Sequence, residues 1–287
     1  MLRIAVPNKG GLMPAAVSML REAGYRQRAS DGELTCLDHA NDVEFFYLRP
    51  RDIAVYVASG DLDYGITGRD LHIDAGVDVE EVLDLNFGAS TFRFAAKPGR
   101  FASPKDLAGA RIATAYPGVV NRHLEELGIT ASVIRLDGAV ENAIGLGLAD
   151  AIADVVDTGA TLRQMGLVPI GDEPVLRSTA VLIRRAGSAD QSATKGNGHT
   201  VLVRRLSGVL VARQYVMIVY DVHADNLDAA VALTPGIESP TISQLHRQGW
   251  VAVQAMVLRS EVHKIMDELY DTGARAILVT DIHACRL

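Results

Sequence analysis

The chain has 287 residues and is 48% hydrophobic, so its length favours two or three domains and its composition excludes an intrinsically disordered chain. Its 28 Lys and Arg residues are outnumbered by 35 Asp and Glu residues, which gives a formal net charge of -7. This balance excludes nucleic acid as the expected partner, because proteins that bind nucleic-acid phosphates usually carry excess positive charge. Any phosphate-bearing partner is expected to be a small molecule.

The cysteines and the length of the apolar runs indicate which class of protein this is and in which compartment it is expected. Cys36 and Cys285 are the two cysteines and lie far apart in the sequence, which argues against a disulfide framework and against a structural zinc site. No apolar run approaches the roughly 20 residues of a membrane helix. The apolar run at the start is too short for a secretory signal. We therefore expect a cytoplasmic protein with no membrane partner.

Strands and helices alternate through the first part of the chain. Leu2, Ile4 and Val6 have the spacing of a strand, and a Pro-Asn-Lys-Gly-Gly turn follows them. The pattern then predicts a helix, a strand, a second helix and a short strand at 13–23, 43–48, 50–60 and 63–68. This alternation indicates a mostly parallel sheet with ligand loops at the ends of its strands.

The middle of the chain repeats this organisation. Ser103 is expected to cap a helix that has Pro104 at its first position. The elements that follow are a strand at 111–116, helices at 119–127 and 140–148, and a strand at 151–156. Residues 60–66 and 147–153 resemble each other, because each has a Gly at a helix end, an Asp three residues later and then a short strand. This similarity, if it reflects a repeat, predicts two α/β lobes with a ligand cleft between them.

The last part of the chain has a different pattern. Segment 187–199 is polar and rich in Gly and Ser, and it is predicted to be an exposed loop or linker. Beyond it the predicted order is strand, helix, strand, strand, helix and strand, at 215–222, 227–231, 241–245, 250–258, 260–273 and 276–282. This βαββαβ order is that of a ferredoxin-like domain. Such a module more often regulates or assembles than catalyses.

Segment 154–162, DVVDTGATL, joins a predicted strand to a predicted helix. Backbone N–H groups at such a turn favour an anion, Gly159 lets a ligand approach, and Thr158 and Thr161 add hydroxyl donors. Asp154 and Asp157 suit ribose hydroxyls or Mg²⁺ better than phosphate, so the turn suits a phosphorylated sugar. The alternative is an ordinary helix start with Asp157 or Thr158 as its N-cap.

Four charged residues lie at other predicted strand or helix ends. Lys9 can reach a phosphate or pyrophosphate, or it can be a solvated loop lysine. Arg49 leaves the same two alternatives, although its guanidinium suits bidentate anion binding. Asp70 is either an N-cap or a ligand to an adenine or ribose, and Glu141 either complements a helix dipole or faces the cleft.

Five segments together resemble a known family: PNKGG at 7–11, FFYLRPRDIAVYVASGDLDYGITGRDL at 45–71, RIATAYP at 111–117, LDGAVENAIGLGLADAIADVVDTGATL at 136–162 and TPGIESPTIS at 234–243. On these motifs the chain resembles the long, histidine-regulated form of ATP phosphoribosyltransferase, almost from end to end. The resemblance implies an α/β fold with two periplasmic-binding-protein-like (type II) lobes that form the catalytic cleft, plus a C-terminal ferredoxin-like βαββαβ regulatory domain. It places lobe I at 1–91 and 178–211, lobe II at 92–177 and the histidine-binding domain at 212–287.

The same resemblance implies a glycosyltransferase of histidine biosynthesis. N1 of ATP would displace pyrophosphate from phosphoribosyl pyrophosphate, with Mg²⁺ as cofactor, and phosphoribosyl-ATP would be the product. The phosphoribosyl-binding loop would contain Asp154, Asp157, Thr158, Gly159, Ala160 and Thr161. The ATP and pyrophosphate cleft would contain Lys9, Gly10, Arg49, Asp70, Tyr116 and Glu141, with Mg²⁺ held mainly through substrate phosphates.

One departure from the family concerns Asp157, because family members often carry Ser or another residue at this position. A carboxylate beside a phosphate is unfavourable unless it points away or meets a cation. Phosphate binding is therefore expected to fall to the backbone and the threonines of the loop.

The resemblance also implies regulation and assembly. Free histidine would inhibit by feedback, AMP is a second expected inhibitor, and the subunits would form dimers and hexamers. The histidine pocket would contain Asp221, Ile237, Thr241, Met256 and Ala276.

Two other hypotheses about the function stay open when only the residues are considered. One is a two-lobed receptor without catalysis, and the other is a phosphoribosyltransferase that acts on a different base.

Overall fold

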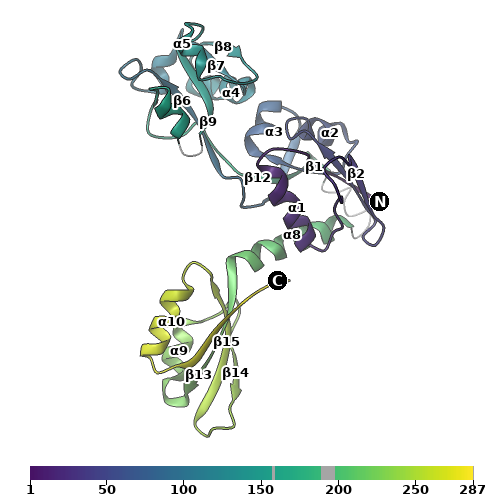
Figure 1. Cartoon of the computed structure of the whole chain (residues 1–287), viewed down its shortest axis with the longest axis vertical. Helices are drawn as coiled ribbons and strands as arrows, with labels where there is room; N and C mark the ends of the chain where they lie inside the picture. The colour runs from purple at the N-terminus through teal and green to yellow at the C-terminus, as the bar shows by residue number, and fades with distance from the viewer. Residues whose placement is uncertain (157–158, 189–197, 287) are drawn as a thin grey trace. The chain divides into compact units, whose positions relative to one another are not determined.

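The computed structural model describes residues 1–156, 159–188 and 198–286 (Figure 1). The chain forms two compact units, one of residues 1–21 and 25–200 and the other of residues 22–24 and 201–287. The first unit contains two sheets and the second contains a third. Across the described ranges, no helix combines the length and the apolar character that crossing a bilayer requires.

The first sheet, which we call the lobe I sheet, has the strand order β2-β3-β1-β4-β12-β5. Its strands are β1 (Leu2–Pro7), β2 (Thr35–Asp38), β3 (Val43–Leu48), β4 (Tyr64–Gly68), β5 (Val79–Asp84) and β12 (Ala180–Arg185). Its helices are α1 (Leu12–Glu22), α2 (Ile53–Ser59) and α3 (Arg69–Ala75). β1 is parallel to β3 and β4, whereas β12 is antiparallel to β4 and β5. Ile4, Ala5 and Val6 are fully buried, as expected for a central parallel strand.

The second sheet, the lobe II sheet, has the order β10-β6-β9-β7-β8, and β11 also pairs with β6. Its strands are β6 (Ser90–Ala96), β7 (Arg111–Thr114), β8 (Ser132–Arg135), β9 (Ala151–Val156), β10 (Val168–Pro169) and β11 (Leu176–Ser178). The helical segments are η1 (Pro104–Leu107), α4 (Pro117–Leu127), α5 (Asn142–Gly145) and α6 (Ala160–Gln164). β7 is parallel to β8 and β9, and β6 is antiparallel to β9.

The two sheets share one topology. In each sheet the first of three parallel strands lies between the second and the third of them, as β1 lies between β3 and β4 and β7 lies between β8 and β9. An antiparallel strand then follows the third strand, β12 beside β4 and β6 beside β9. Each of these two strands follows a segment where the chain passes from one lobe to the other. This is the arrangement of periplasmic-binding-protein-like (type II) lobes, as predicted.

The predicted internal repeat corresponds to a shared pair of hydrogen bonds. The carboxylate of Asp63 accepts from the N–H of Arg3 at 2.9 Å, and that of Asp150 accepts from the N–H of Arg111 at 3.0 Å. In return, the N–H groups of Asp63 and Asp150 donate to the carbonyls of Arg3 and Arg111 at 2.9 and 2.8 Å. Each Asp therefore binds the start of the first parallel strand of its lobe, just before the third parallel strand begins.

The second unit is a ferredoxin-like domain preceded by helix α8 (Gly198–Gln214). Its elements are β13 (Tyr215–His223), η2 (Ala224–Asn226), α9 (Leu227–Leu233), β14 (Thr241–Gln244), β15 (Trp250–Leu258), α10 (Val262–Asp271) and β16 (Arg275–Asp281). The sheet order is β14-β15-β13-β16, with all neighbours antiparallel. Ile218, Tyr220 and Leu269 belong to the core in which α9 and α10 cover one face of this sheet. The predicted βαββαβ order is confirmed.

Four local predictions were wrong. The helix expected at 140–148 is the short α5, because Gly147 has a φ of 72°, a left-handed conformation that ends the helical segment. The strand expected to reach 116 ends at Thr114, and α4 begins at Pro117 rather than at 119. Helix α8 was not predicted, and it begins at Gly198, inside the segment expected to be a linker.

Candidate active site

Predicted cleft residues of lobe I follow the carboxyl ends of neighbouring parallel strands. Lys9 and Gly10 come after β1, Arg49 comes after β3 and Asp70 comes after β4. The Lys9 and Arg49 turns leave the sheet at the same edge, because the last residues of β1 and β3 are paired in register. Both side chains are exposed. Gly10 has a φ of 78°, and a Cβ added there would meet no atom within 4 Å, so its backbone is accessible.

Lobe II presents its predicted residues at the equivalent edge. Tyr116 follows β7, Glu141 is at the N-cap of α5 in the connection after β8, and Asp154 lies in the second half of β9. β7 is parallel to both β8 and β9, so these positions meet at the carboxyl edge of the sheet. In open α/β sheets this edge is where ligands bind.

Tyr116 connects the two lobes within the first unit. Burial and the carboxylate of Asp70 raise the pKa of Tyr116, and the charge of Asp154 and a hydrogen bond with Asp70 act in the same direction. The guanidinium of Arg51 lies 4.7 Å from the ring centroid and acts in the opposite direction. Phe92 packs edge-on at a centroid distance of 5.4 Å. Tyr116 therefore stays a neutral phenol at neutral pH and can donate a hydrogen bond.

Asp154 is a carboxylate in an unfavourable position for its own charge. Burial raises the pKa of Asp154, and the nearby Glu141 raises it further. The N–H of Val155 donates to Asp154 Oδ1 at 2.8 Å and compensates only in part. A ligand that brings hydroxyl donors or a cation would stabilise this charge.

The fit of a divalent metal can be judged from the same carboxylates. In the part of the chain that the structure describes, no group of three or more His, Cys, Asp or Glu side chains is placed to hold a metal. Mg²⁺ is usually bound by one or two carboxylates together with substrate phosphates and water. Asp154 and Glu141, which interact electrostatically, fit a metal of this shared kind and do not fit a cage made of protein ligands alone.

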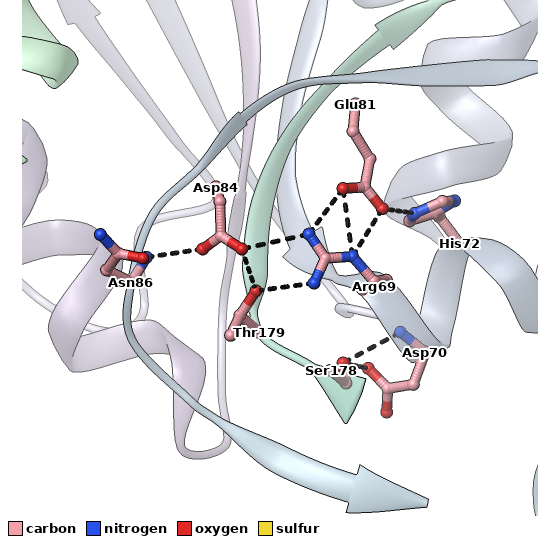
Figure 2. Close-up of polar contacts among 8 residues, drawn as sticks. All are labelled: Arg69, Asp70, His72, Glu81, Asp84, Asn86, Ser178 and Thr179. Carbon is pink, nitrogen blue, oxygen red and sulfur yellow. Dashed lines mark hydrogen bonds and ion pairs between the residues drawn. The ribbon is translucent and has the colours of Figure 1, made fainter. Parts of the chain in front are cut away.

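Asp70 is held by a residue from a distant part of the chain (Figure 2). Ser178 Oγ donates to Asp70 Oδ1 at 2.8 Å and accepts from the N–H of Asp70 at 3.1 Å. Both residues are buried, with 8% of Asp70 and 3% of Ser178 exposed. Ser178 is not predictable from the sequence, because the two residues are 108 positions apart and nothing in the local pattern around Ser178 marks it.

Arg69, which precedes Asp70, holds a second network in the same figure. Its guanidinium donates to Glu81 at 2.7 Å and to Asp84 at 3.1 Å, and Asp84 also accepts the hydroxyl of Thr179 at 2.8 Å. Burial would raise the pKa values of Glu81 and Asp84, but their hydrogen bonds lower both. Asp84 ends β5 and Thr179 precedes β12. Arg69 therefore binds both segments that lead from one lobe to the other.

A further contact joins α3 of lobe I to α4 of lobe II. The carboxylate of Asp74, whose side chain is 8% exposed, accepts from Arg51 Nη1 at 2.6 Å and from the N–H of Gly118 at 2.8 Å. A Cβ at Gly118 would lie 2.2 Å from the carbonyl oxygen of Asp74. The close approach therefore requires glycine at this position. Arg51 lies in the RPRD part of the 45–71 motif and is not among the predicted site residues, and Asp74 has no local signal in the sequence.

The loop after β9 is described in part. Asp157 and Thr158 lie outside the described residues, so the predictions about them stay predictions. Gly159 is at the N-cap of α6 with a φ of 70°, which corrects the alternative in which Asp157 or Thr158 caps this helix. Ala160 is the first residue of α6, and Thr161 in its first turn is exposed.

The predicted histidine residues lie in the second unit. Asp221 on β13, Thr241 on β14 and Met256 on β15 share the sheet face opposite α9 and α10, because they alternate with the core residues of these strands or pair with residues that do. Ala276 lies in the irregular part of β16, with a φ of 52°. Ile237 lies in the connection between α9 and β14 and is 37% exposed.

Comparisons with known proteins agree with one another. The family model described as ATP phosphoribosyltransferase matches residues 49–208, and the model described as HisG, C-terminal domain, matches residues 212–284. An ATP phosphoribosyltransferase from Salinispora tropica is 67% identical over 287 residues, and one from Streptomyces avermitilis is 60% identical, each with 100% of both chains covered.

One solved structure has a similar fold over most of the chain. It is an ATP phosphoribosyl transferase (HisG:HisZ) complex from Thermotoga maritima, with a TM-score of 0.61 and 25% identity. The match covers 72% of this chain and 97% of that one. The remainder of this chain therefore has no counterpart in the matched chain.

Proposed function

Because the chain belongs to the ATP phosphoribosyltransferase family and is a glycosyltransferase, we propose that it transfers the 5-phosphoribosyl group of phosphoribosyl pyrophosphate to N1 of ATP. The C1–O bond to pyrophosphate breaks, its electron pair leaves with pyrophosphate, and a bond from N1 to C1 forms. The product is phosphoribosyl-ATP, in the first step of histidine biosynthesis. The observation that carries this proposal is the interaction of Asp70, Tyr116 and Asp154, which brings acidic and phenolic groups of both lobes to one place.

The donor binds, in this proposal, at the end of β9. Asp154 accepts hydrogen bonds from ribose hydroxyls, which relieves the electrostatic cost of its burial beside Glu141. Its charge also stabilises the positive charge that develops on the ribose as the C1–O bond breaks. The loop residues Asp157, Thr158, Gly159, Ala160 and Thr161 surround the 5-phosphate, with backbone N–H groups and threonine hydroxyls as the donors.

Mg²⁺ is the proposed cofactor, with Asp154 and Glu141 as its protein ligands and substrate phosphates as the others. When bound, it neutralises charge on the leaving pyrophosphate. Lys9 and Arg49 add cations at the carboxyl edge of the lobe I sheet, where both side chains are exposed. Each 1.4 kcal/mol or so of stabilisation that is confined to the transition state gives about a tenfold increase in rate.

The acceptor ATP is proposed to bind against Tyr116 and Asp70. The hydroxyl of Tyr116 stays protonated because burial and the Asp70 carboxylate raise its pKa. Its one proton is donated to Asp70, so its oxygen can accept a hydrogen bond from the nucleotide. Asp70 accepts from the adenine or ribose. N1 of adenine attacks with its own lone pair, so the protein has to supply orientation and no covalent nucleophile.

Feedback inhibition by histidine at the second unit is also part of the proposal, as are AMP inhibition and assembly into dimers and hexamers. Support comes from Asp221, Thr241 and Met256, which share one sheet face and offer a carboxylate and a hydroxyl to an amino acid. Asp221→Asn should weaken inhibition by histidine and leave turnover without histidine unchanged. Asp228→Asn on α9, which covers the opposite face, is the matched control and should keep full inhibition.

The decisive assay mixes the protein with ATP, phosphoribosyl pyrophosphate and Mg²⁺ and follows both pyrophosphate release and the absorbance of the product. Formation of phosphoribosyl-ATP supports the proposal. Turnover with another base in place of ATP would point to a different phosphoribosyltransferase. Binding of nucleotide without any turnover would point to a receptor.

A further inference from the structure

The hydroxyl of Ser178 has no role in the reaction proposed above, yet it makes two hydrogen bonds to one cleft residue. It donates to Asp70 Oδ1 at 2.8 Å and accepts from the N–H of Asp70 at 3.1 Å. Ser178 is 3% exposed, so water does not compete for these bonds. In Figure 2 the second carboxylate oxygen of Asp70 points away from Ser178. The serine therefore occupies one oxygen and leaves the other for Tyr116 or a ligand.

Two other features show that the carboxylate of Asp70 is confined. A Cβ at Gly68 would lie 2.3 Å from Asp70 Oδ1, so the carboxylate folds back over a position that has no side chain. Asp70 is also in the first turn of α3, where the helix dipole favours an acidic group. Ser178 completes this arrangement because its hydroxyl donates to Oδ1 and so fixes which way the carboxylate faces.

Ser178 is itself held in place through its neighbour. The carbonyl of Thr179 accepts from the N–H of Arg69 at 2.9 Å, and its hydroxyl accepts from Arg69 Nη1 at 3.3 Å and donates to Asp84 at 2.8 Å. Arg69 is in turn bound to Glu81. Adjacent residues of α3 thus bind adjacent residues of the segment that returns from lobe II: Arg69 binds Thr179, and Asp70 binds Ser178.

We propose that Ser178 is a positioning residue that acts through Asp70. It holds the Asp70 carboxylate in the orientation in which its free oxygen meets Tyr116 and the ATP acceptor. The inference rests on the proposed function for the identity of the substrate. Ser178 is the last residue of β11 in the lobe II sheet, just before the chain enters β12 of lobe I, so the orientation of Asp70 depends on the segment that links the lobes.

A double-mutant cycle tests this proposal. Ser178→Ala is expected to lower kcat/KM for ATP by about tenfold, the range for losing a hydrogen bond to a charged group. In an Asp70→Asn background the same substitution should change kcat/KM by less than about twofold, because the carboxylate that Ser178 orients is gone. Ser178→Thr keeps the hydroxyl and should keep most of the activity.

Thr179→Val is the matched control. It removes the neighbouring hydroxyl, which binds Asp84 and not Asp70, so its effect on kcat/KM should be the same in both backgrounds. If Ser178→Ala lowers kcat/KM equally in the wild-type and the Asp70→Asn backgrounds, the proposal is overturned and Ser178 is a purely structural residue. A wild-type enzyme that does not use ATP would refute the proposed function instead, and nucleotide binding measured across the same four proteins would then decide the role of Ser178.

Discussion

Replacing Gly118 with alanine tests whether the contact between α3 and α4 sets the geometry of the cleft. The new Cβ would lie 2.2, 2.9 and 3.0 Å from the carbonyl oxygen, carbonyl carbon and Cα of Asp74. Carbon atoms in contact are separated by about 3.5–4.0 Å. The start of α4 must therefore retreat by roughly 1 Å, and the 2.8 Å hydrogen bond from the Gly118 N–H to Asp74 stretches beyond bonding distance.

The expected cost can be worked from these contacts. Loss of a hydrogen bond to a buried carboxylate costs about 1.5–3 kcal/mol, and the overpacking adds about 1–3 kcal/mol. The higher helix propensity of alanine offsets at most about 1 kcal/mol. We expect the free energy of unfolding to fall by about 1.5 kcal/mol or more. Because a 1 Å misplacement of reacting groups can cost about 10²-fold, kcat/KM should fall by between about ten- and a hundredfold.

The assay combines thermal unfolding with turnover of ATP and phosphoribosyl pyrophosphate. Gly145→Ala is the matched control, because a Cβ there meets nothing within 4 Å and Gly145 lies in α5 of the same lobe. It isolates the gain in helix propensity and should leave turnover unchanged. If Gly118→Ala is as stable and active as Gly145→Ala, the contact with Asp74 does not control the cleft and the reasoning fails.

Three further outcomes are expected. Asp154→Asn should abolish most turnover yet raise stability at neutral pH. Burial raises the pKa of Asp154, so the charged form destabilises the fold, and the gain in Tm should grow as the pH rises from 3.8 through the raised pKa; a less stable variant at neutral pH would contradict this. Asp70→Asn should lower the pKa of Tyr116, because the Asp70 carboxylate helps to raise it, and tyrosinate absorbance against pH measures the change. Lys9→Ala should reduce kcat with little effect on stability, since the side chain is exposed; an unchanged rate would make Lys9 a solvated loop residue.

Elements with a strong local signal could be predicted from the sequence. The strands at 43–48 and 151–156 have the predicted bounds, because all residues of each except Glu44 and Asp154 are apolar or aromatic and turn residues follow them. The Ser103 cap is also confirmed, with a capping box to Asp106. The βαββαβ order of the second unit followed from the same local patterns.

Contacts between distant residues could not be predicted in this way. The position of β12 beside β4 and the bond between Ser178 and Asp70 depend on the return of the chain after a whole lobe. The short length of α5 depends on the left-handed conformation of Gly147. The apolar pattern of this segment is helical and does not reveal that conformation. For the site, the alternation of strands and helices predicted that Lys9, Asp70 and Asp154 lie near strand ends. Their roles in binding the substrates rest on the family resemblance.

The insertion of lobe II into lobe I also affects how the protein is made. β5 is an edge strand whose one neighbour in the described sheet is β12, and the lobe II strands lie between the two in sequence. A nascent chain leaving the ribosome must therefore expose an unfinished first sheet until β12 emerges. At about 5–20 residues per second, that interval lasts on the order of 5–20 s. Chaperone binding during translation should be concentrated there.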